Sequence, residues 1–279
     1  MSITLYGAVG YSILFNNKNN KYIIIFSDNH SQLNKCNDYM DISIWLKKKF
    51  KSSHILLEEV NHDEFNFKEL WAYSEHTQKL KKLYLNNKNN IKPIDIRPNL
   101  IPFSLEIFDN YKDNNKITLF NFLNIINSFY KLNNTFFIKN SNIYNLIKNY
   151  IFYYKFSYYY KTSKNISFIN HFSYIKKMYK LFLKKNNKLL KLSLVDIYNN
   201  YQYILEEINS LLNDIMEWYI CSCIINCNTT HILHTGMYHS TNIIKLLKKY
   251  YNFKIIIDKN YNTSNNGCIT INKKYDKLF

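Results

Sequence analysis

The sequence predicts an α/β protein with a mainly parallel sheet flanked by helices and interrupted by a basic, all-helical insertion. Strands and amphipathic helices alternate over 1–110 and again over 196–279, as they do in right-handed crossover units. Several predicted strands are continuously apolar, which is typical of strands buried on both faces. The concentration of lysine in 111–195 predicts the insertion.

The first half of the α/β domain, 1–110, has the predicted order β-α-β-α-β. Residues 3–15 are expected to form a strand in which Gly7 and Gly10 permit a bulge or bend, and residues 16–20 a turn. The strand over 21–26 ends in Ser27-Asp28-Asn29-His30. Asp41 is expected to cap a short helix, because its side chain can accept a bond from a free N–H group of the first turn. The elements that follow are a strand over 54–60, a helix over about 66–85 and a strand over 91–97.

The second half, 196–279, continues the alternation after the insertion. Its predicted elements are a helix over 196–219, a strand over 230–233, a helix over 240–251 and a strand over 253–258. The Asn-rich residues beyond Asn260 are expected to form a loose hairpin or coil. The sheet is therefore predicted to combine strands from both sides of the insertion.

The composition excludes several classes of protein. A chain of 279 residues with 47% hydrophobic content can bury a core, so it is not a disordered tail, a collagen or a disulfide-stapled miniprotein. The net charge of +17 is concentrated in 111–191, which hold 15 lysines and one acid. The 36 lysines and single arginine indicate an A/T-rich genome, such as that of a large DNA virus. An abundant lysine is therefore weak evidence of function, and a retained glycine or arginine is stronger evidence.

Neither a secretory signal nor a transmembrane segment is expected, because polar residues interrupt every apolar run before about 18 residues. Five cysteines in a chain of this length do not predict a disulfide framework. These observations predict a soluble protein of the cytoplasm, or of the host cytoplasm if the source is a virus.

Ionisable side chains follow four of the predicted strands at their carboxyl ends. In open α/β sheets this edge is where ligands bind, so we expect the side chains to converge on one site. The candidates are Asp28, His30, Glu58, Glu59, Asp95, Arg97, His234 and His239, together with Gly236.

The most specific of these motifs is His234-x-Gly236-x-x-His239, at a strand-to-helix turn. Gly236 is expected to provide either a positive φ or a close approach of the main chain. The helix start offers free N–H groups to an anion and disfavours an imidazolium at His239. A neutral His239 would suit metal ligation or general-base catalysis. The alternative is that His239 only caps the helix.

The apolar strand ending in Asp28-Asn29-His30, the strand Ile55-Leu56-Leu57-Glu58-Glu59 and the later Gly236-Met237-Tyr238-His239 resemble the erythromycin esterase/ChaN/TIKI-TraB superfamily. Uncharacterised proteins of large DNA viruses carry similar patterns. The resemblance covers about 1–110 and 225–258 and implies that His30, Glu58, Glu59, Gly236 and His239 line an active site. Since adjacent strand residues face opposite sides, only one of the two glutamates is expected to point directly into it.

Asp95 and Arg97 are two residues apart on one predicted strand and therefore lie on one face. They could orient a polar or anionic substrate, because arginine binds anions through two parallel bonds. The alternative is an ion pair that ties the strand end to a neighbouring loop.

A structural zinc site formed by Cys221, Cys223, Cys227, His231 and His234 is less well supported than core cysteines, because the spacing lacks a C-x2-C knuckle. The chain also lacks a Gly-x-Ser-x-Gly nucleophile elbow, a Gly-x-Gly-x-x-Gly motif and a P-loop.

The basic insertion, 111–195, has two interpretations. Eight aromatic residues lie among lysines in Tyr150–Tyr160, which could stack on single-stranded nucleic acid or lie on an anionic membrane surface. Alternatively the aromatic side chains form the core of the insertion and the lysines are solvated.

The sequence therefore predicts a hydrolase of the superfamily named above, acting on a small-molecule or peptide substrate. His30, Glu58, Glu59 and His239 are the predicted catalytic residues, and Asp28, Asp95, Arg97, His234 and Gly236 are predicted to bind substrate. A divalent metal ion, if one takes part, would be held by His30, Glu58 and His239. The competing hypothesis is a non-catalytic protein that binds nucleic acid or anionic membranes through 111–195.

Overall fold

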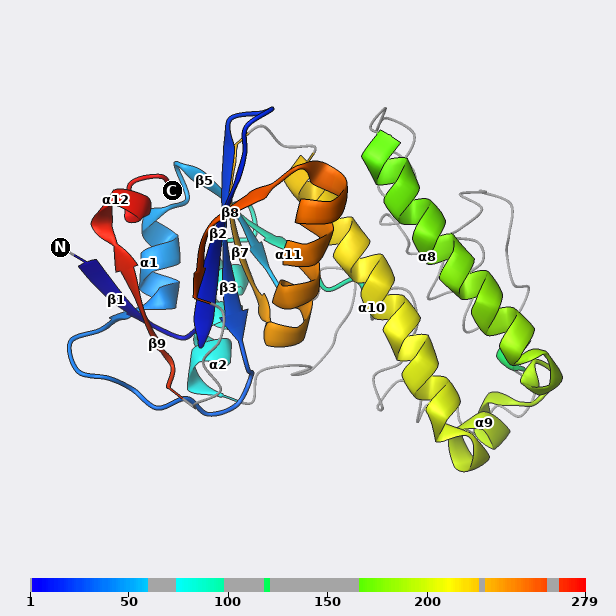
Figure 1. Cartoon of the computed structure of the whole chain (residues 1–279). Coiled ribbons are helices and arrows are strands. Elements are labelled where there is room, and N and C mark those ends of the chain that lie inside the picture. Colours follow the sequence, from blue (N-terminus) through cyan, green and yellow to red (C-terminus); the bar gives the residue numbers. More distant parts are fainter. Residues whose placement is uncertain (1, 60–73, 98–117, 121–165, 226–228, 260–265) are drawn as a thin grey trace. The chain divides into compact units, whose positions relative to one another are not determined.

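The computed structural model describes residues 2–59, 74–97, 118–120, 166–225, 229–259 and 266–279. The chain divides into two compact units (Figure 1). The first unit comprises Met1–Asp95 and Cys223–Phe279, and the second unit comprises Ile96–Ser222. The fold class is α/β, as predicted, with a six-stranded, mostly parallel sheet in the first unit.

The six strands lie in the order β6-β5-β7-β3-β2-β8. Their bounds are Ile91–Pro93 (β6), Ser53–Leu57 (β5), Thr230–Gly236 (β7), Lys21–Asp28 (β3), Gly10–Asn16 (β2) and Lys254–Lys259 (β8). Parallel pairing joins β6, β5, β7 and β3, whereas β2 is antiparallel to both of its neighbours. The sheet combines strands from both sides of the insertion, as predicted, and β7 from the second half lies between β5 and β3 of the first half.

Helices cover both faces of this sheet. Helix α11 (Met237–Tyr251) packs on β3 and β7, while α1 (Ile42–Lys48) and α2 (Glu75–Asn86) contribute to the core of the opposite face (Figure 1). In that core the Phe26 ring meets Trp45 edge to face, with ring centroids 5.5 Å apart. Burial of one such side chain stabilises the fold by about 1.5–3 kcal/mol. Asp41 caps α1 by accepting a bond from the Ser43 N–H, as expected.

A second, three-stranded sheet has the order β4-β1-β9. It consists of β4 (Met40–Asp41), β1 (Ser2–Tyr6) and β9 (Cys268–Asn272), and α12 (Lys273–Asp276) follows β9. The predicted single strand over 3–15 is wrong, because Gly7 has a φ of +117° and divides it between the two sheets. The predicted coil beyond Asn260 is wrong for β9 and α12, and 260–265 lie outside the described residues.

A disulfide joins Cys36 to Cys268, which are 232 positions apart. Its presence differs from the expectation that the cysteines of this chain are reduced. Cys221 and Cys223 are buried free thiols, in agreement with the interpretation of these two as core residues. Cys227 lies outside the described residues.

In the second unit, α8 (Ile166–Lys185) is followed by η1 (Asn187–Leu189), α9 (Leu194–Asn200) and α10 (Gln202–Ile225), whose last residues belong to the first unit. The predicted helix over 196–219 is thus divided at Tyr201, where α9 ends. Most of the predicted insertion, including Tyr150–Tyr160, lies outside the described residues. In the part of the chain that is described, no helix has the length and apolar character needed to cross a membrane.

Candidate functional site

Glu58 lies one residue beyond β5, and its carboxylate is fixed by the neighbouring strand. Its N–H donates to the carbonyl of His234, 3.0 Å away. Its Oε2 accepts bonds from Thr235 Oγ1 at 2.7 Å and from the Gly236 N–H at 2.6 Å. A buried carboxylate requires such donors to offset the loss of water. Glu58 therefore has a defined position at the carboxyl edge of the sheet.

The carboxylate of Glu58 lies between two imidazoles. The Nε2 of His30 is 3.7 Å from Glu58 Oε2, and the Nε2 of His239 is 3.7 Å from Glu58 Oε1. Parallel pairing causes this convergence, since Asp28 at the end of β3 is the register partner of Gly236 at the end of β7. Three of the predicted catalytic residues thus come together at one carboxylate.

His30 is held as an imidazolium by the acids on either side of it. Burial opposes the charge, but the interactions with Asp28 and Glu58 outweigh burial and raise the pKa of His30 to about 10. The ring nitrogen Nδ1 lies 3.3 Å from Asp28 Oδ2, although neither atom has a well-oriented hydrogen bond. About a third of the side chain is exposed, at 36%. His30 is thus a charged group that a substrate can reach.

Asp28 acts through histidines and does not face solvent. It is buried, and its Oδ1 is 2.8 Å from Nε2 of His76, whose Nδ1 is 3.0 Å from Ser74 Oγ. Burial would raise the pKa of Asp28, but the interactions with His30 and His76 hold it well below the ordinary value. Asp28 thus contacts the two histidines from a buried position, and its predicted role in substrate binding stays a prediction.

His76 is a residue of the site that the sequence analysis missed. It falls within the predicted helix over 66–85, where one histidine appears as an ordinary helix residue. The signal that could have identified it is Ser74-x-x-Thr77, a capping box that starts α2 at Glu75. A helix start at this position directs a histidine of the first turn toward the sheet edge.

Gly236 has a φ of −54°, so it is required by close approach and not by a positive φ. A Cβ at this position would lie 3.0 Å from His30 Nε2 and 3.3 Å from Glu58 Oε2. The N–H group at this helix start, which was expected to bind an external anion, donates instead to Glu58. The anion at the start of α11 is therefore part of the protein.

His234 and Glu59 lie beside the site, next to a small cavity. His234 is buried, its Nε2 is 2.9 Å from the Gly7 carbonyl, and burial lowers its pKa. The cavity has a volume of about 20 Å³, enough for one water molecule. Its lining consists of Asp28, His30, Leu57, Glu58, Glu59, Thr77, Leu80 and His234. Of the two glutamates, Glu58 forms the ion-pair contacts with His30 and His239.

Asp95 and Arg97 are divided between the two units. Asp95 is buried in the first unit, where its N–H donates to the Glu59 carbonyl at 3.1 Å. Arg97 belongs to the second unit, where its Nη1 donates to Asn213 Oδ1 at 3.0 Å. This bond to a neutral side chain of α10 is not the ion pair with a neighbouring loop that was considered as the alternative.

His30, Glu58 and His239 are the residues predicted to hold a metal ion. Glu58 Oε2 accepts bonds from Thr235 and Gly236, and the Nε2 of each imidazole is 3.7 Å from a carboxylate oxygen. Among the described residues, no group of three or more His, Cys, Asp and Glu is arranged to hold a metal ion. The three residues predicted to hold a metal ion are therefore neighbours, but they are not arranged as the ligands of one ion.

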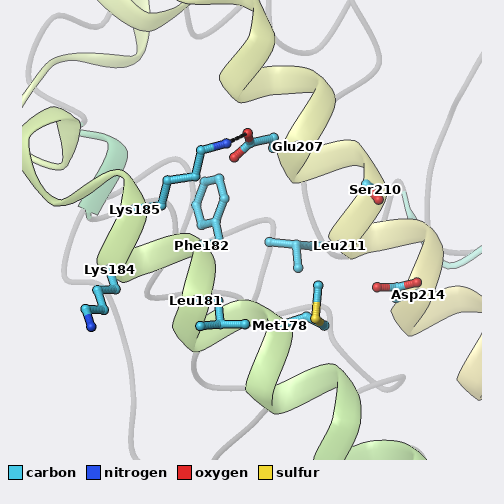
Figure 2. Close-up of a pocket in the computed structure, with 9 residues that line it drawn as sticks. All are labelled: Met178, Leu181, Phe182, Lys184, Lys185, Glu207, Ser210, Leu211 and Asp214. Carbon is cyan, nitrogen blue, oxygen red and sulfur yellow. Dashed lines mark hydrogen bonds and ion pairs between the residues drawn. The ribbon is translucent and has the colours of Figure 1, made fainter.

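The second unit contains a larger cavity, of about 620 Å³, between α8 and α10 (Figure 2). Its lining is formed by Met178, Leu181, Phe182, Lys184, Lys185, Glu207, Ser210, Leu211 and Asp214. An ion pair joins Lys185 to Glu207 across the cavity. At Asp214, burial and then the nearby Glu217 raise the pKa of the carboxyl group to about 7.

The two units thus differ in chemistry. The first presents a charged, hydrogen-bonded cluster at a sheet edge, and the second presents a cavity walled largely by apolar side chains. No protein-family model, curated protein or solved structure matches this chain at the level taken as significant.

Proposed function

We propose that the first unit is a hydrolase that uses water to cleave an ester or amide bond of a small-molecule or peptide substrate. The observation that carries the proposal is the Glu58 carboxylate between the imidazoles of His30 and His239. Histidines paired with fixed carboxylates are the common means of proton transfer in enzymes. The resemblance to the erythromycin esterase/ChaN/TIKI-TraB superfamily supports the same reaction class.

His30 is proposed to stabilise negative charge on the substrate. Attack on a carbonyl carbon moves charge onto its oxygen, and a fixed cationic donor lowers the free energy of that state. His30 suits this role because Asp28 and Glu58 keep it protonated and its side chain is partly exposed. Its Nε2 is beyond hydrogen-bond distance of Glu58, so the N–H can donate to a substrate oxygen.

His239 is proposed to accept the proton of the attacking water. Its Nε2 faces Glu58 Oε1, and a carboxylate on one side of an imidazole stabilises the cation that forms when the ring takes up a proton. The water oxygen bonds to the acyl carbon, and the proton is returned to the leaving group, which departs as an alcohol or amine. Asp28 and His76 position His30 during these steps.

The direct test is hydrolysis of a panel of chromogenic esters and peptide anilides by the full chain. Glu58→Gln and His239→Ala are each expected to lower kcat/KM by about 10²–10⁴-fold, the range typical of general acid–base groups. Glu206→Gln, an exposed substitution in the second unit, is the matched control and should leave activity unchanged. Activity should also persist within about twofold after dialysis against a chelator, because no step uses a metal ion.

Circular dichroism and thermal melting are needed to show that the variants fold. If folded Glu58→Gln and His239→Ala hydrolyse the best substrate as fast as the unchanged chain, the proposed roles are wrong. Loss of activity in the chelator, restored by a divalent ion, would contradict the metal-free mechanism alone.

A second candidate function is binding of nucleic acid or anionic membranes by the second unit. The observation that favours it is α8, a helix of 20 residues that carries five lysines and no acid. Lys185 of this helix pairs with Glu207, and the other four lysines could attract phosphate groups. This function is independent of the Glu58 site and does not compete with it.

A further inference from the structure

We propose that the Cys36–Cys268 disulfide is a thiol–disulfide exchange site and that it positions His30 against Glu58. A dithiol that reduces the bond would release the loop that carries His30. The catalytic consequence rests on the proposed function, whereas the structural consequence does not.

The first step of the argument is the position of Cys36 in the chain. Residues 29–39, here called the His30 loop, connect β3 to β4. His30 lies next to the β3 end of this loop, and Cys36 follows six positions later. The disulfide ties the loop to the start of β9, a strand paired along its length with β1. The loop is thus attached to the body of the unit at both ends and, near its middle, by a covalent bond.

The other attachments of the loop lie near the disulfide, where Leu33 and Tyr39 also pack against Tyr6. Leu33 is buried, and its carbonyl accepts a bond from Tyr6 Oη at 3.2 Å. The Asn34 carbonyl accepts a bond from the Gly267 N–H at 3.0 Å, and Lys35 forms an ion pair with Glu75 at 2.7 Å. These contacts involve β1, the residue before β9 and α2, and the disulfide is the one covalent bond among the described attachments of this part of the loop.

The conformation of His30 depends on its surroundings. Its φ of +50° is in the left-handed region, which is unfavourable for a residue with a side chain unless the surrounding structure imposes it. The ring is held by Asp28 and Glu58 and packs against Gly236. Once the loop is released, the main chain at His30 can relax to a negative φ, which withdraws the ring from Glu58.

The exchange chemistry is accessible at this bond. Both cysteines are half-buried, unlike the fully enclosed Cys221. A thiolate of a dithiol attacks one sulfur and forms a mixed disulfide, and the second thiolate then displaces the chain. The protein gains two electrons and two protons as two thiols, and the dithiol becomes a cyclic disulfide. The dithiol comes from solution and reacts directly at the disulfide, so the exchange requires no separate binding site for it.

Limited proteolysis with trypsin tests whether reduction releases the loop. The rate of cleavage after Lys35 is measured by mass spectrometry before and after treatment with dithiothreitol. We expect about a tenfold increase at Lys35, because local opening exposes its peptide bond. Lys18, in the exposed β2–β3 turn, is the internal control and should be cut at the same rate in both forms.

Histidine NMR tests whether His30 moves. In the oxidised chain His30 should titrate near a pKa of about 10, and in the reduced chain near the ordinary value of about 6.5. Cys36→Ser/Cys268→Ser should reproduce the reduced state and no longer respond to dithiothreitol. Cys223→Ala removes a buried free thiol and should keep the full response.

Two results would overturn the inference. One is a bond that dithiothreitol reduces only after urea has unfolded the chain. The other is a reduced chain in which Lys35 cleavage and His30 titration match the oxidised chain. Neither measurement uses hydrolysis, so an inactive protein that shows both changes would reject the proposed function and retain the exchange site.

Discussion

At Gly236 the main chain passes so close to two site residues that one methyl group is enough to disturb them. Gly236→Ala would place a carbon 3.0 Å from His30 Nε2 and 3.3 Å from Glu58 Oε2. The φ of −54° suits alanine, so backbone strain is not the expected cause of any change. We expect hydrolysis to fall by about tenfold or more because the groups are misplaced, with a small decrease in Tm. Lys245→Ala, an exposed substitution on α11, is the control, and full activity of the glycine variant would refute the close-packing argument.

Asp214 gives the second prediction at this scale. Its folded-state pKa of about 7 exceeds the ordinary value of 3.8, so the folded protein retains a proton that the unfolded chain releases. The stability that this proton provides is complete below about pH 4 and is lost as the pH rises to about 7. Asp214→Asn should therefore stabilise the chain at pH 8, on the order of a few kcal/mol, and have little effect at pH 4. Urea denaturation at both pH values measures the difference, and an equal effect at both would contradict the shifted pKa.

The residues of the site could be predicted to the extent that they follow strand ends. His30, Glu58 and His239 were identified because parallel strands bring their carboxyl ends to one edge. His76 was missed because its place in the site depends on where α2 begins, and the capping box that marks this start was not recognised. The hydrogen bond from the Gly236 N–H to Glu58 at the start of α11 was also not predictable. Sequence order does not reveal which carboxylate lies next to a helix start.

At the scale of elements, pairing between β5 and β7 creates a buried histidine pair. His54 and His231 are register partners, with Nδ1 and Nε2 3.4 Å apart. Burial, and then the charge of Lys21, lowers the pKa of His231 to about 3, and burial also lowers that of His54. Both rings are therefore neutral in the folded protein at neutral pH.

This pair predicts sensitivity to acid. As the pH falls below about 6.5, both histidines take up protons in the unfolded chain but stay neutral in the folded protein, because their folded-state pKa values are lower. Stability should therefore decrease from about pH 6.5 toward pH 3. His231→Gln, which has no titrating ring, should reduce the slope of unfolding free energy against pH between 6.5 and 4, measured by urea denaturation. An unchanged slope would show that the ring is not buried in its neutral form.

Alternation of apolar residues predicted most strands but not their division into sheets. The pattern over 3–15 is continuous, and only the positive φ of Gly7 sends its two halves to different sheets. Similarly, Cys268–Asn272 forms a strand because it pairs with β1. Strand formation at such edges depends on long-range pairing, and local propensity alone does not reveal it.

At the scale of the whole molecule, the excess of positive charge is concentrated in one segment of the chain. The segment 111–191 carries 15 lysines and one acid, while the remaining residues carry 22 bases and 19 acids. If the second candidate function is correct, single-stranded nucleic acid should bind with an affinity that falls about 10-fold or more between 50 and 200 mM salt. Fluorescence anisotropy with a labelled oligonucleotide measures it, and His239→Ala should not change it. Binding that is absent, or independent of salt, would reject this function.

The order of the strands in the sheet has a consequence for synthesis of the chain. β7 lies between β5 and β3, yet it follows them in sequence by about 170 residues or more. When β3 and β5 leave the ribosome, their common neighbour has not been translated, and the residues of the second unit emerge first. The edges of β3 and β5 that face β7 must therefore stay without their strand partner during that interval, although β2 and β6 can already pair with the other edges. Non-local pairing of this kind folds slowly and exposes strands to aggregation, so nascent chains of this protein should depend on a chaperone until β7 has emerged.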